Sequence, residues 1–393
     1  MKIKRVLIVA GTASMIKQFN LRNIKILQKQ GYVVHVAANF KNPGTITQKL
    51  AESLIQSLED NGVAVHQIPF GRGMGTIKDN VQSVKALLNI YDMYTFDFVH
   101  VQSAIASVLV RFCQLLVKQK IIYTIHGLQF DKGGSKRRWV FFYPVEWVLS
   151  YLTHTIVTIN NHDAQVVKNG FKNKYTYQIG GVGIEYDRFK QIPGLPSNDL
   201  LAKELGIDLA SLVMVSVGEL SNRKNQQSIL EALVKRPGND IHLILVGIGP
   251  EKEAMEKYCD ENGLSNNVHF LGYCDGDQLV QIINIADVAI FPSKLEGLLT
   301  AGLEMMAAGK VLLYSEVRGI KDYCIDSVNA VSLKSVSAND INDAIDKAKM
   351  FKQDGLLLKM GKRAQETAMQ YDKSVIDGAM NTIYEELGRV ENG

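Results

Sequence analysis

Residues 291–309 read FPSKLEGLLTAGLEMMAAG. The segment follows an apolar run, residues 286–291, that is typical of a buried strand, and it turns at Pro292-Ser293 before a helix of small residues. A strand end, a tight turn and a helix N-terminus together form a common binding place for phosphate. Glu296 and Glu304 flank the start of this helix, and carboxylates accept hydrogen bonds from hydroxyl groups. The segment therefore predicts a ligand that carries both phosphate and sugar.

Apolar strands and helices alternate along most of the chain. The alternation predicts an α/β fold with two doubly wound, Rossmann-like domains, each a parallel sheet covered by helices on both faces. The loop at 192–198 contains two prolines and a glycine, which is typical of a linker, and we expect a hinge near 194–196. The expected domains are 1–192 and 193–373, facing each other across a cleft, with a last helix at about 374–393 packing back on the first domain. The predicted strands are 6–10, 32–38, 63–68, 98–101, 121–125, 155–159, 213–217, 242–246, 268–271, 288–291, 311–314 and 330–333.

Length and composition favour a globular protein with ample core-forming material. The chain has 393 residues, of which 46% are hydrophobic and 21% charged, so one small domain is excluded. No apolar run reaches about 18 residues, so no transmembrane helix is expected, and the N-terminal segment indicates a first strand rather than a signal peptide. The four cysteines form no C-x-x-C pair, so neither a disulfide framework nor a zinc knuckle is expected.

The charge is distributed unevenly along the chain. Residues 1–190 contain 24 Lys and Arg against 11 Asp and Glu, whereas the remainder contains 20 against 29. A basic first half suggests an anionic partner, either nucleic acid or an anionic membrane surface.

Several short motifs occur in a fixed order and together carry a resemblance. Beyond residues 291–309 they are TIHG (124–127), GVGI (181–184) followed by Phe189, GEL (218–220) with Lys224-Asn225, VGIGP (246–250) and FLGY (270–273). In this combination the whole chain resembles the family 4 glycosyltransferases of the two-domain GT-B fold, of the bacterial capsular and exopolysaccharide type. The resemblance implies transfer from a nucleotide-sugar donor with retention of configuration, without a metal or other cofactor.

The resemblance assigns roles to the residues of the glutamate segment. Glu296 would hold hydroxyl groups of the donor sugar, and Glu304 would accept hydrogen bonds from the ribose. The amides of Gly297, Leu298 and Leu299 would face the sugar or the phosphate. The alternative is that both glutamates are solvated charges at a helix end, although their small and apolar neighbours make full exposure less favourable.

The predicted loop after strand 213–217 supplies the cations. The resemblance implies that Lys224 contacts the diphosphate. A diphosphate needs a cation, and the ammonium group of lysine is a suitable point charge. The family more often has an arginine near the position of Glu219, and Arg223 is a candidate to replace it. The alternative is an exposed basic turn at Arg223-Lys224.

Three further residues follow predicted strands. His126 would lie near the leaving diphosphate and the sugar, and the alternative is that it is a hydrogen-bonded structural histidine. For His100, which also lies at a strand end, a structural and a functional role are equally favoured. Gly11 begins the first strand-to-helix turn, which in similar enzymes usually approaches the donor phosphates or the acceptor. The turn lacks the G-x-G-x-x-G of nicotinamide and flavin enzymes. Tyr273 follows strand 268–271, where similar enzymes meet the base of the nucleotide through backbone groups.

The predicted helix at 136–153 begins with a basic cluster joined to aromatic residues, KRRWVFFY. Together with Arg111, Lys118 and Lys120 it resembles a surface for anionic lipid headgroups. The alternative places Trp139, Phe142 and Tyr143 in the core. No nucleic-acid-binding module is recognisable, so nucleic acid is not an expected partner.

The resemblance implies a sugar transferase that uses a UDP-sugar as donor and a hydroxyl of a polyprenyl-linked saccharide as acceptor. We expect a cytoplasmic protein that is peripheral on the inner face of the cell membrane. No D-x-D pair lies in a suitable loop, so Lys224 and helix amides would stabilise the leaving diphosphate. A nucleotide-sugar epimerase and a non-catalytic binder of sugar nucleotides are the alternatives.

Overall fold

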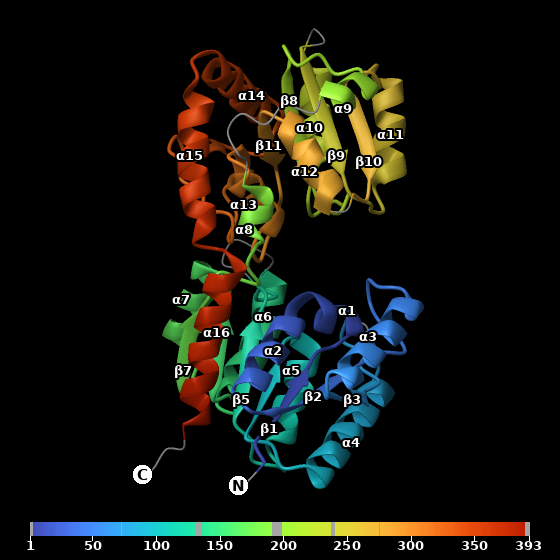
Figure 1. Cartoon of the computed structure of the whole chain (residues 1–393), viewed down its shortest axis with the longest axis vertical. Coiled ribbons are helices and arrows are strands. Elements are labelled where there is room, and N and C mark those ends of the chain that lie inside the picture. The colour runs from blue at the N-terminus through green and yellow to red at the C-terminus, as the bar shows by residue number, and fades with distance from the viewer. Residues whose placement is uncertain are drawn as a thin grey trace. The chain divides into compact units, whose positions relative to one another are not determined.

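The computed structural model describes residues 3–71, 73–130, 136–190, 199–236, 240–274 and 276–389. The chain forms two compact units, one of Met1–Val182 with Ser374–Gly393 and the other of Gly183–Lys373 (Figure 1). The linker and hinge predicted at 192–198 lie outside the described residues. The chain first passes from one unit to the other between Val182 and Gly183, whereas the boundary was expected at 192/193. The reason is that Ile184 and Phe189 already belong to the core of the second unit.

The first unit contains a parallel sheet that, within the described residues, has the strand order β3-β2-β1-β4-β5-β6-β7. Its strands are β1 (Arg5–Val9), β2 (Val33–Ala38), β3 (Ala64–Gln67), β4 (Phe98–Val101), β5 (Ile121–Ile125), β6 (Thr155–Thr158) and β7 (Tyr175–Gln178). Its helices are α1 (Ala13–Met15), the π-helix η1 (Ile16–Asn20), α2 (Leu21–Lys29), α3 (Gln48–Asp60), α4 (Ile77–Met93), α5 (Ala104–Cys113), α6 (Lys136–Ser150), α7 (Asn161–Gly170) and α16 (Lys373–Gly388).

The central strands β1, β4, β5 and β6 are almost wholly buried because helices cover both faces of the sheet. Alternate residues of β1 enter different cores: Val6 and Ile8 pack into one, and Leu7 and Val9 into the other. Helix α16 completes the first core with apolar residues at helical spacing. These are Met380, Ile383, Tyr384 and Leu387.

The second unit repeats the same plan with the described strands in the order β10-β9-β8-β11-β12-β13, all parallel. Its strands are β8 (Leu212–Val217), β9 (Ile241–Val246), β10 (Val268–Gly272), β11 (Val288–Phe291), β12 (Val311–Ser315) and β13 (Ala330–Leu333). Its helices are α8 (Tyr186–Phe189), α9 (Asp199–Glu204), α10 (Gln227–Val234), α11 (Lys252–Glu261), α12 (Gly276–Ile285), α13 (Thr300–Ala307), α14 (Ala338–Gln353) and α15 (Leu356–Met369). The predicted α/β class with two Rossmann-like domains is confirmed.

Several local features were not predicted. The helical segment that follows β1 contains the π-helix η1 before α2. Helix α7 and strand β7 were missed, although Asn160 caps α7 by accepting a hydrogen bond from the Asp163 amide. Strand β7 is a partly exposed edge strand, so its sequence carries no continuous apolar run.

Candidate functional site

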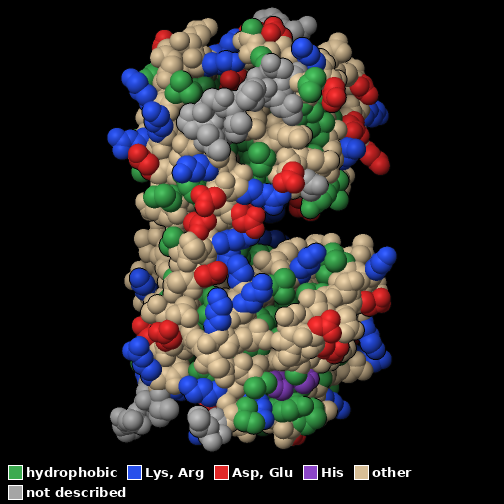
Figure 2. All heavy atoms as spheres, viewed as in Figure 1, with side chains coloured by type: hydrophobic (Ala, Val, Ile, Leu, Met, Phe, Trp, Pro, Cys, Tyr) green, Lys and Arg blue, Asp and Glu red, His purple; other side chains and the backbone are tan. Residues whose placement is uncertain are grey.

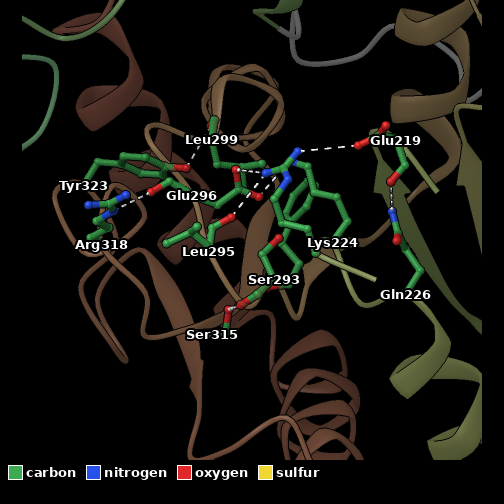
Figure 3. Close-up of polar contacts among 12 residues, drawn as sticks. Glu219, Lys224, Gln226, Ser293, Leu295, Glu296, Leu299, Ser315, Arg318 and Tyr323 are labelled. Atoms are coloured by element: carbon green, nitrogen blue, oxygen red, sulfur yellow. Dashed lines mark hydrogen bonds and ion pairs between the residues drawn. The ribbon is translucent and has the colours of Figure 1, made fainter. Parts of the chain in front are cut away.

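The loop between β11 and α13 carries the glutamate segment, and residues at the end of β12 and beyond it hold this loop in place. Ser315 Oγ donates a hydrogen bond to the backbone oxygen of Ser293 at 2.5 Å. Arg318 Nε donates to the backbone oxygen of Glu296 at 3.3 Å, and Tyr323 Oη donates to that of Leu299 at 2.9 Å (Figure 3). Sequence reasoning missed these three residues, although they lie at or just beyond the carboxyl end of the neighbouring strand, where ligand loops of such sheets gather.

Glycine at position 319 allows the two loops to approach closely. A Cβ atom there would lie 2.3 Å from the backbone oxygen of Gly297, and the φ angle of Gly319 is +80°. Only glycine combines this backbone conformation with such a contact. The loop that bears Glu296 is therefore supported by backbone packing as well as by side-chain hydrogen bonds.

Two cations meet the carboxylate of Glu296. Its side chain is 4% exposed, and Oε1 lies 2.7 Å from Lys224 Nζ while Oε2 lies 3.1 Å from Arg223 Nη1. Arg223 also lies 3.8 Å from the Glu219 carboxylate, so the basic pair spans two acidic groups (Figure 3). The structure thus brings together Glu296, Lys224 and Arg223, and it does not place Arg223-Lys224 as a wholly exposed turn, because Lys224 is 12% exposed.

Backbone contacts tie the cation loop to the glutamate loop. The Lys294 amide donates to the backbone oxygen of Arg223 at 2.9 Å. Asn225 adopts a left-handed conformation, with φ of 60°, and its side-chain amide donates to the backbone oxygen of Pro292 at 3.2 Å. Asparagine tolerates this conformation better than most residues, which explains its place directly after Lys224.

Glycines after β8 and β9 let the cation loop and the loop after β9 pack backbone to backbone next to Lys224. A Cβ on Gly247 would lie 1.9 Å from the backbone oxygen of Gly218, and one on Gly249 would lie 2.2 Å from that of Leu220. The Lys224 side chain passes over Gly218, with Cε 3.4 Å from the position of a Cβ there. The backbones of the motifs GEL and VGIGP therefore pack against each other, and the Lys224 side chain lies against Gly218 of the first motif.

The three residues expected to offer amides precede helix α13, which begins at Thr300. Leu299 is the N-cap residue and no side chain caps it, while its own side chain is buried in the core. Gly297 and Leu298 lie in the preceding turn, between the Glu296 carboxylate and the helix. Their placement is compatible with the predicted contact to a ligand.

Glu304 lies within α13 and faces charged residues of the same unit. Burial raises its pKa to about 7, Lys373 and Arg188 act to lower it, and Glu185 acts to raise it. Within the described part of the chain, no residue donates a hydrogen bond to this carboxylate. A partly buried acceptor without a partner suits a ligand that brings hydroxyl groups.

His126 lies in the first unit, directly after β5. Its Nε2 lies 3.0 Å from Gln102 Oε1, and its ring packs against Phe19 with the centroids 4.6 Å apart. Burial lowers its pKa to about 4, so the imidazole is neutral at physiological pH. His126 lines a pocket whose other walls include Phe19, Arg22, Gly181 and Ile376.

Gly11 and Tyr273 occupy contrasting surroundings. A Cβ on Gly11 would lie 3.1 Å from Ser103 Oγ, so the first strand-to-helix turn packs tightly against the start of α5. Tyr273 follows β10 and is 77% exposed. Its predicted role near the nucleotide base remains a prediction.

Among the described residues, no three His, Cys, Asp or Glu side chains are arranged to hold a metal ion. No helix in the same ranges combines the length and the apolar character needed to cross a bilayer.

Each of the two units matches a glycosyltransferase family model. The family model described as "Glycosyltransferase Family 4" matches residues 21–178, and the one described as "Glycosyl transferases group 1" matches residues 197–367. The putative glycosyltransferase EpsD of Bacillus subtilis is 27% identical over 97% of this chain and 96% of its own length. An N,N'-diacetylbacillosaminyl-diphospho-undecaprenol alpha-1,3-N-acetylgalactosaminyltransferase of Campylobacter jejuni is 22% identical over 84% of this chain and 88% of its own.

Solved structures share the fold at low sequence identity. A glycosyltransferase from Rickettsia africae superimposes with a TM-score of 0.77 at 15% identity, covering 100% of both chains. Anabaena HepE in complex with UDP and glucose gives a TM-score of 0.74 at 17% identity, covering 98% of this chain and 100% of its own.

Proposed function

Because this chain belongs to glycosyltransferase family 4 and has the GT-B fold, we propose that it moves a sugar from a UDP-sugar to a hydroxyl of a lipid-linked saccharide. The observation that carries the proposal is the contact of Lys224 and Arg223 with the nearly buried Glu296 at the carboxyl edge of the second sheet. Cations bind a diphosphate and a carboxylate binds sugar hydroxyls. Both halves of a nucleotide sugar thus find complementary groups in one place.

The proposed roles follow from charge and burial. Lys224 and Arg223 neutralise the departing diphosphate, with help from the amides of Gly297 to Leu299, and no metal is required for that stabilisation. Arg223 supplies the second cation for the diphosphate, because Glu219 occupies the position near which the family more often has an arginine. Glu296 holds the donor sugar, and Glu304 accepts the ribose hydroxyls.

Retention of configuration is part of the proposal. Glu296 lies just before α13 and Glu304 lies within this helix, and we propose that both bind the donor and do not flank a scissile bond as the carboxyl pair of a glycosidase does. Attack from the face that the leaving diphosphate vacates, with that phosphate taking the proton of the acceptor hydroxyl, needs no carboxylate nucleophile. His126 in the first unit is the proposed contact of the acceptor side.

Donor and acceptor classes draw support from similar proteins. The HepE complex contains UDP and glucose, and the names of two relatives, from Campylobacter jejuni and Escherichia coli, specify diphospho-undecaprenol acceptors. We infer a polyprenyl-diphosphate-linked acceptor and a place in exopolysaccharide or capsule synthesis. The protein would act at the cytoplasmic face of the cell membrane.

A donor screen followed by an acceptor assay tests this function. UDP-, GDP- and ADP-sugars are compared by thermal shift, because a ligand at 100 times its Kd stabilises a protein by about 2.7 kcal/mol. We expect a UDP-sugar to give the largest shift and to lose its sugar only when membrane extract supplies an acceptor. Sugar release without an acceptor would indicate an epimerase, and binding without any turnover would indicate a non-catalytic binder.

The membrane surface that we propose for the first unit differs in part from the predicted one. Trp139 stacks on Tyr143, with ring centroids 4.9 Å apart, and packs against the core with Phe142. Arg111, expected on the basic surface, is buried and paired with Glu146 at 2.8 Å. The outward face of α6 instead presents exposed apolar side chains. They are Val140, Phe141, Val145 and Val148, together with Tyr151 just beyond the helix.

Basic residues flank this outward face. Lys118, Lys120 and Lys172 line a hollow together with Tyr151, and Arg137 and Arg138 are exposed at the start of α6. Apolar side chains that enter the headgroup region and cations that meet anionic phosphates together favour a bilayer as the partner. The proposed membrane contact is therefore the outward face of α6.

Vesicle sedimentation checks the membrane contact. Replacing Val140 and Val148 by serine should release the protein from vesicles that contain phosphatidylglycerol. Replacing Ile77 and Val81, which are exposed on α4, should not. Equal binding by both double variants, or association of the wild type with itself in place of vesicles, would contradict the assignment.

A further inference from the structure

A chain of polar side chains links the C-terminal helix to His126. Tyr384 of α16 places its hydroxyl 2.7 Å from His100 Nδ1. The other ring nitrogen of His100, Nε2, lies 2.8 Å from Thr124 Oγ1 and 3.4 Å from Gln102 Nε2. Gln102 Oε1 lies 3.0 Å from His126 Nε2. His100, Gln102 and Tyr384 are buried, so no bulk water competes for these contacts.

The donors and acceptors among these hydrogen-bonded side chains specify one direction of donation along the series. The Gln102 oxygen can only accept, so His126 Nε2 carries a proton and donates it to that oxygen. The Gln102 amide nitrogen can only donate, so His100 Nε2 holds a lone pair that also accepts from Thr124. His100 Nδ1 then carries the proton and donates to Tyr384 Oη. Reversing every bond requires the Gln102 amide to turn over, which makes the direction open to experiment.

Both imidazoles in the chain are neutral. Burial lowers the pKa of His100 to about 3 and that of His126 to about 4. A neutral imidazole has one N–H and one lone pair. With its proton on Nε2, His126 retains the lone pair on Nδ1, and no described residue donates a hydrogen bond to that atom.

We propose that Tyr384, His100 and Gln102 are positioning residues that hold His126 in the Nε2-protonated tautomer, so that Nδ1 accepts a hydrogen bond from a sugar hydroxyl. A lone pair repels phosphate oxygens, so this tautomer assigns His126 to a hydroxyl and not to the diphosphate. The assignment of the ligand rests on the proposed function, whereas the tautomer does not. The C-terminal helix thereby contributes to the site of the first unit through two intervening side chains.

Nitrogen NMR of histidine in the full chain reads the tautomer directly. The wild type should show His126 protonated at Nε2. In Tyr384→Phe, His100 Nδ1–H loses its acceptor, so His100 should shift toward the other tautomer, Gln102 should turn over and the His126 signal should become mixed. Tyr32→Phe is the matched control, because Tyr32 lies in the same core and its ring also packs against Phe98.

Kinetics provide the second readout. Tyr384→Phe should raise the KM for the acceptor by about tenfold, the equivalent of one hydrogen bond of about 1.4 kcal/mol, while the KM for the donor stays unchanged. Gln102→Leu should act in the same way if Tyr384→Phe does not fold. A wild-type His126 protonated at Nδ1, or a His126 signal unaffected by both substitutions, overturns the proposal. Full activity of His126→Ala with the expected tautomer would refute only the role assigned to His126 in transfer.

Discussion

Glu296 shows how one residue depends on its neighbours. Its carboxylate is almost buried, and the ion pairs with Lys224 and Arg223 compensate the loss of water. The sequence predicted Glu296 and Lys224 as ligand groups from their motifs. It did not predict that they contact each other, because their positions are 72 residues apart and the contact depends on how the two loops pack.

Glu304 should make donor binding depend on pH. Its pKa of about 7 means that the carboxyl group is protonated below neutrality, whereas ribose hydroxyls bind best to the ionised form. The affinity for a nucleotide sugar should fall as the pH is lowered from about 8 to 6, by up to about tenfold per unit. Calorimetry across this range measures the slope.

Glu304→Gln is the control for that pH dependence, and the slope should vanish in it. The substitution should also stabilise the unliganded protein at pH 8 more than at pH 6. The reason is that a carboxyl group with a raised folded-state pKa loses its contribution to stability as pH rises through about 7. A slope that persists in Glu304→Gln would assign the titration to another group.

At the scale of elements, the segment after β12 braces the donor loop. Tyr323→Phe removes the hydrogen bond to the Leu299 oxygen, which should cost about 1 kcal/mol of unfolding free energy and weaken donor binding. Tyr314→Phe, in the buried strand β12 itself, is the control and should leave donor affinity unchanged. Urea denaturation and donor titration measure the two effects, and equal donor affinity in both variants would contradict the bracing role.

Gly319→Ala should be more damaging than Tyr323→Phe. The added methyl group would meet the Gly297 oxygen at 2.3 Å in a backbone conformation that alanine disfavours. Donor binding should be lost before the fold is, because the clash falls on the loop that bears Glu296. Retained donor affinity in Gly319→Ala would show that this loop tolerates displacement.

Most elements were predictable because their burial leaves a strong pattern. Strands such as β5 and β9 are buried at every position and mostly apolar, since helices cover both faces. Strand β7 and helix α7 were missed because an edge strand carries a weak pattern. The outward face of α6 was misassigned because the helix is apolar on all sides, so its sequence does not show which side meets the core.

At the scale of the whole molecule, each sheet carries a pair of stacked histidines toward one edge. His35 and His66 join β2 and β3 with ring nitrogens 3.0 Å apart, and His242 and His269 join β9 and β10 at 3.2 Å. Burial lowers the pKa of all four, to about 4 for His35 and His269. On the face shown in Figure 2, histidine side chains of the first unit reach the surface beside hydrophobic ones.

These pairs should make both units sensitive to mild acid. A histidine whose pKa is depressed in the folded state stabilises the fold above its unfolded value of about 6.5, and this stability is lost as pH falls toward 4. Hydrogen exchange should therefore show weaker protection of both sheets at pH 5 than at pH 7. His66→Gln should reduce the loss in the first unit alone, and an equal loss in both units of that variant would contradict the assignment.

The central claim is that the second unit binds a nucleotide sugar and that Glu296 contacts its sugar. Calorimetric titration of the wild type and Glu296→Gln with UDP and with the UDP-sugar from the donor screen tests it most directly. The wild type should bind the UDP-sugar more tightly than UDP, and Glu296→Gln should retain UDP while losing this preference. An undiminished preference in Glu296→Gln, or a wild type that binds neither ligand, would contradict the account.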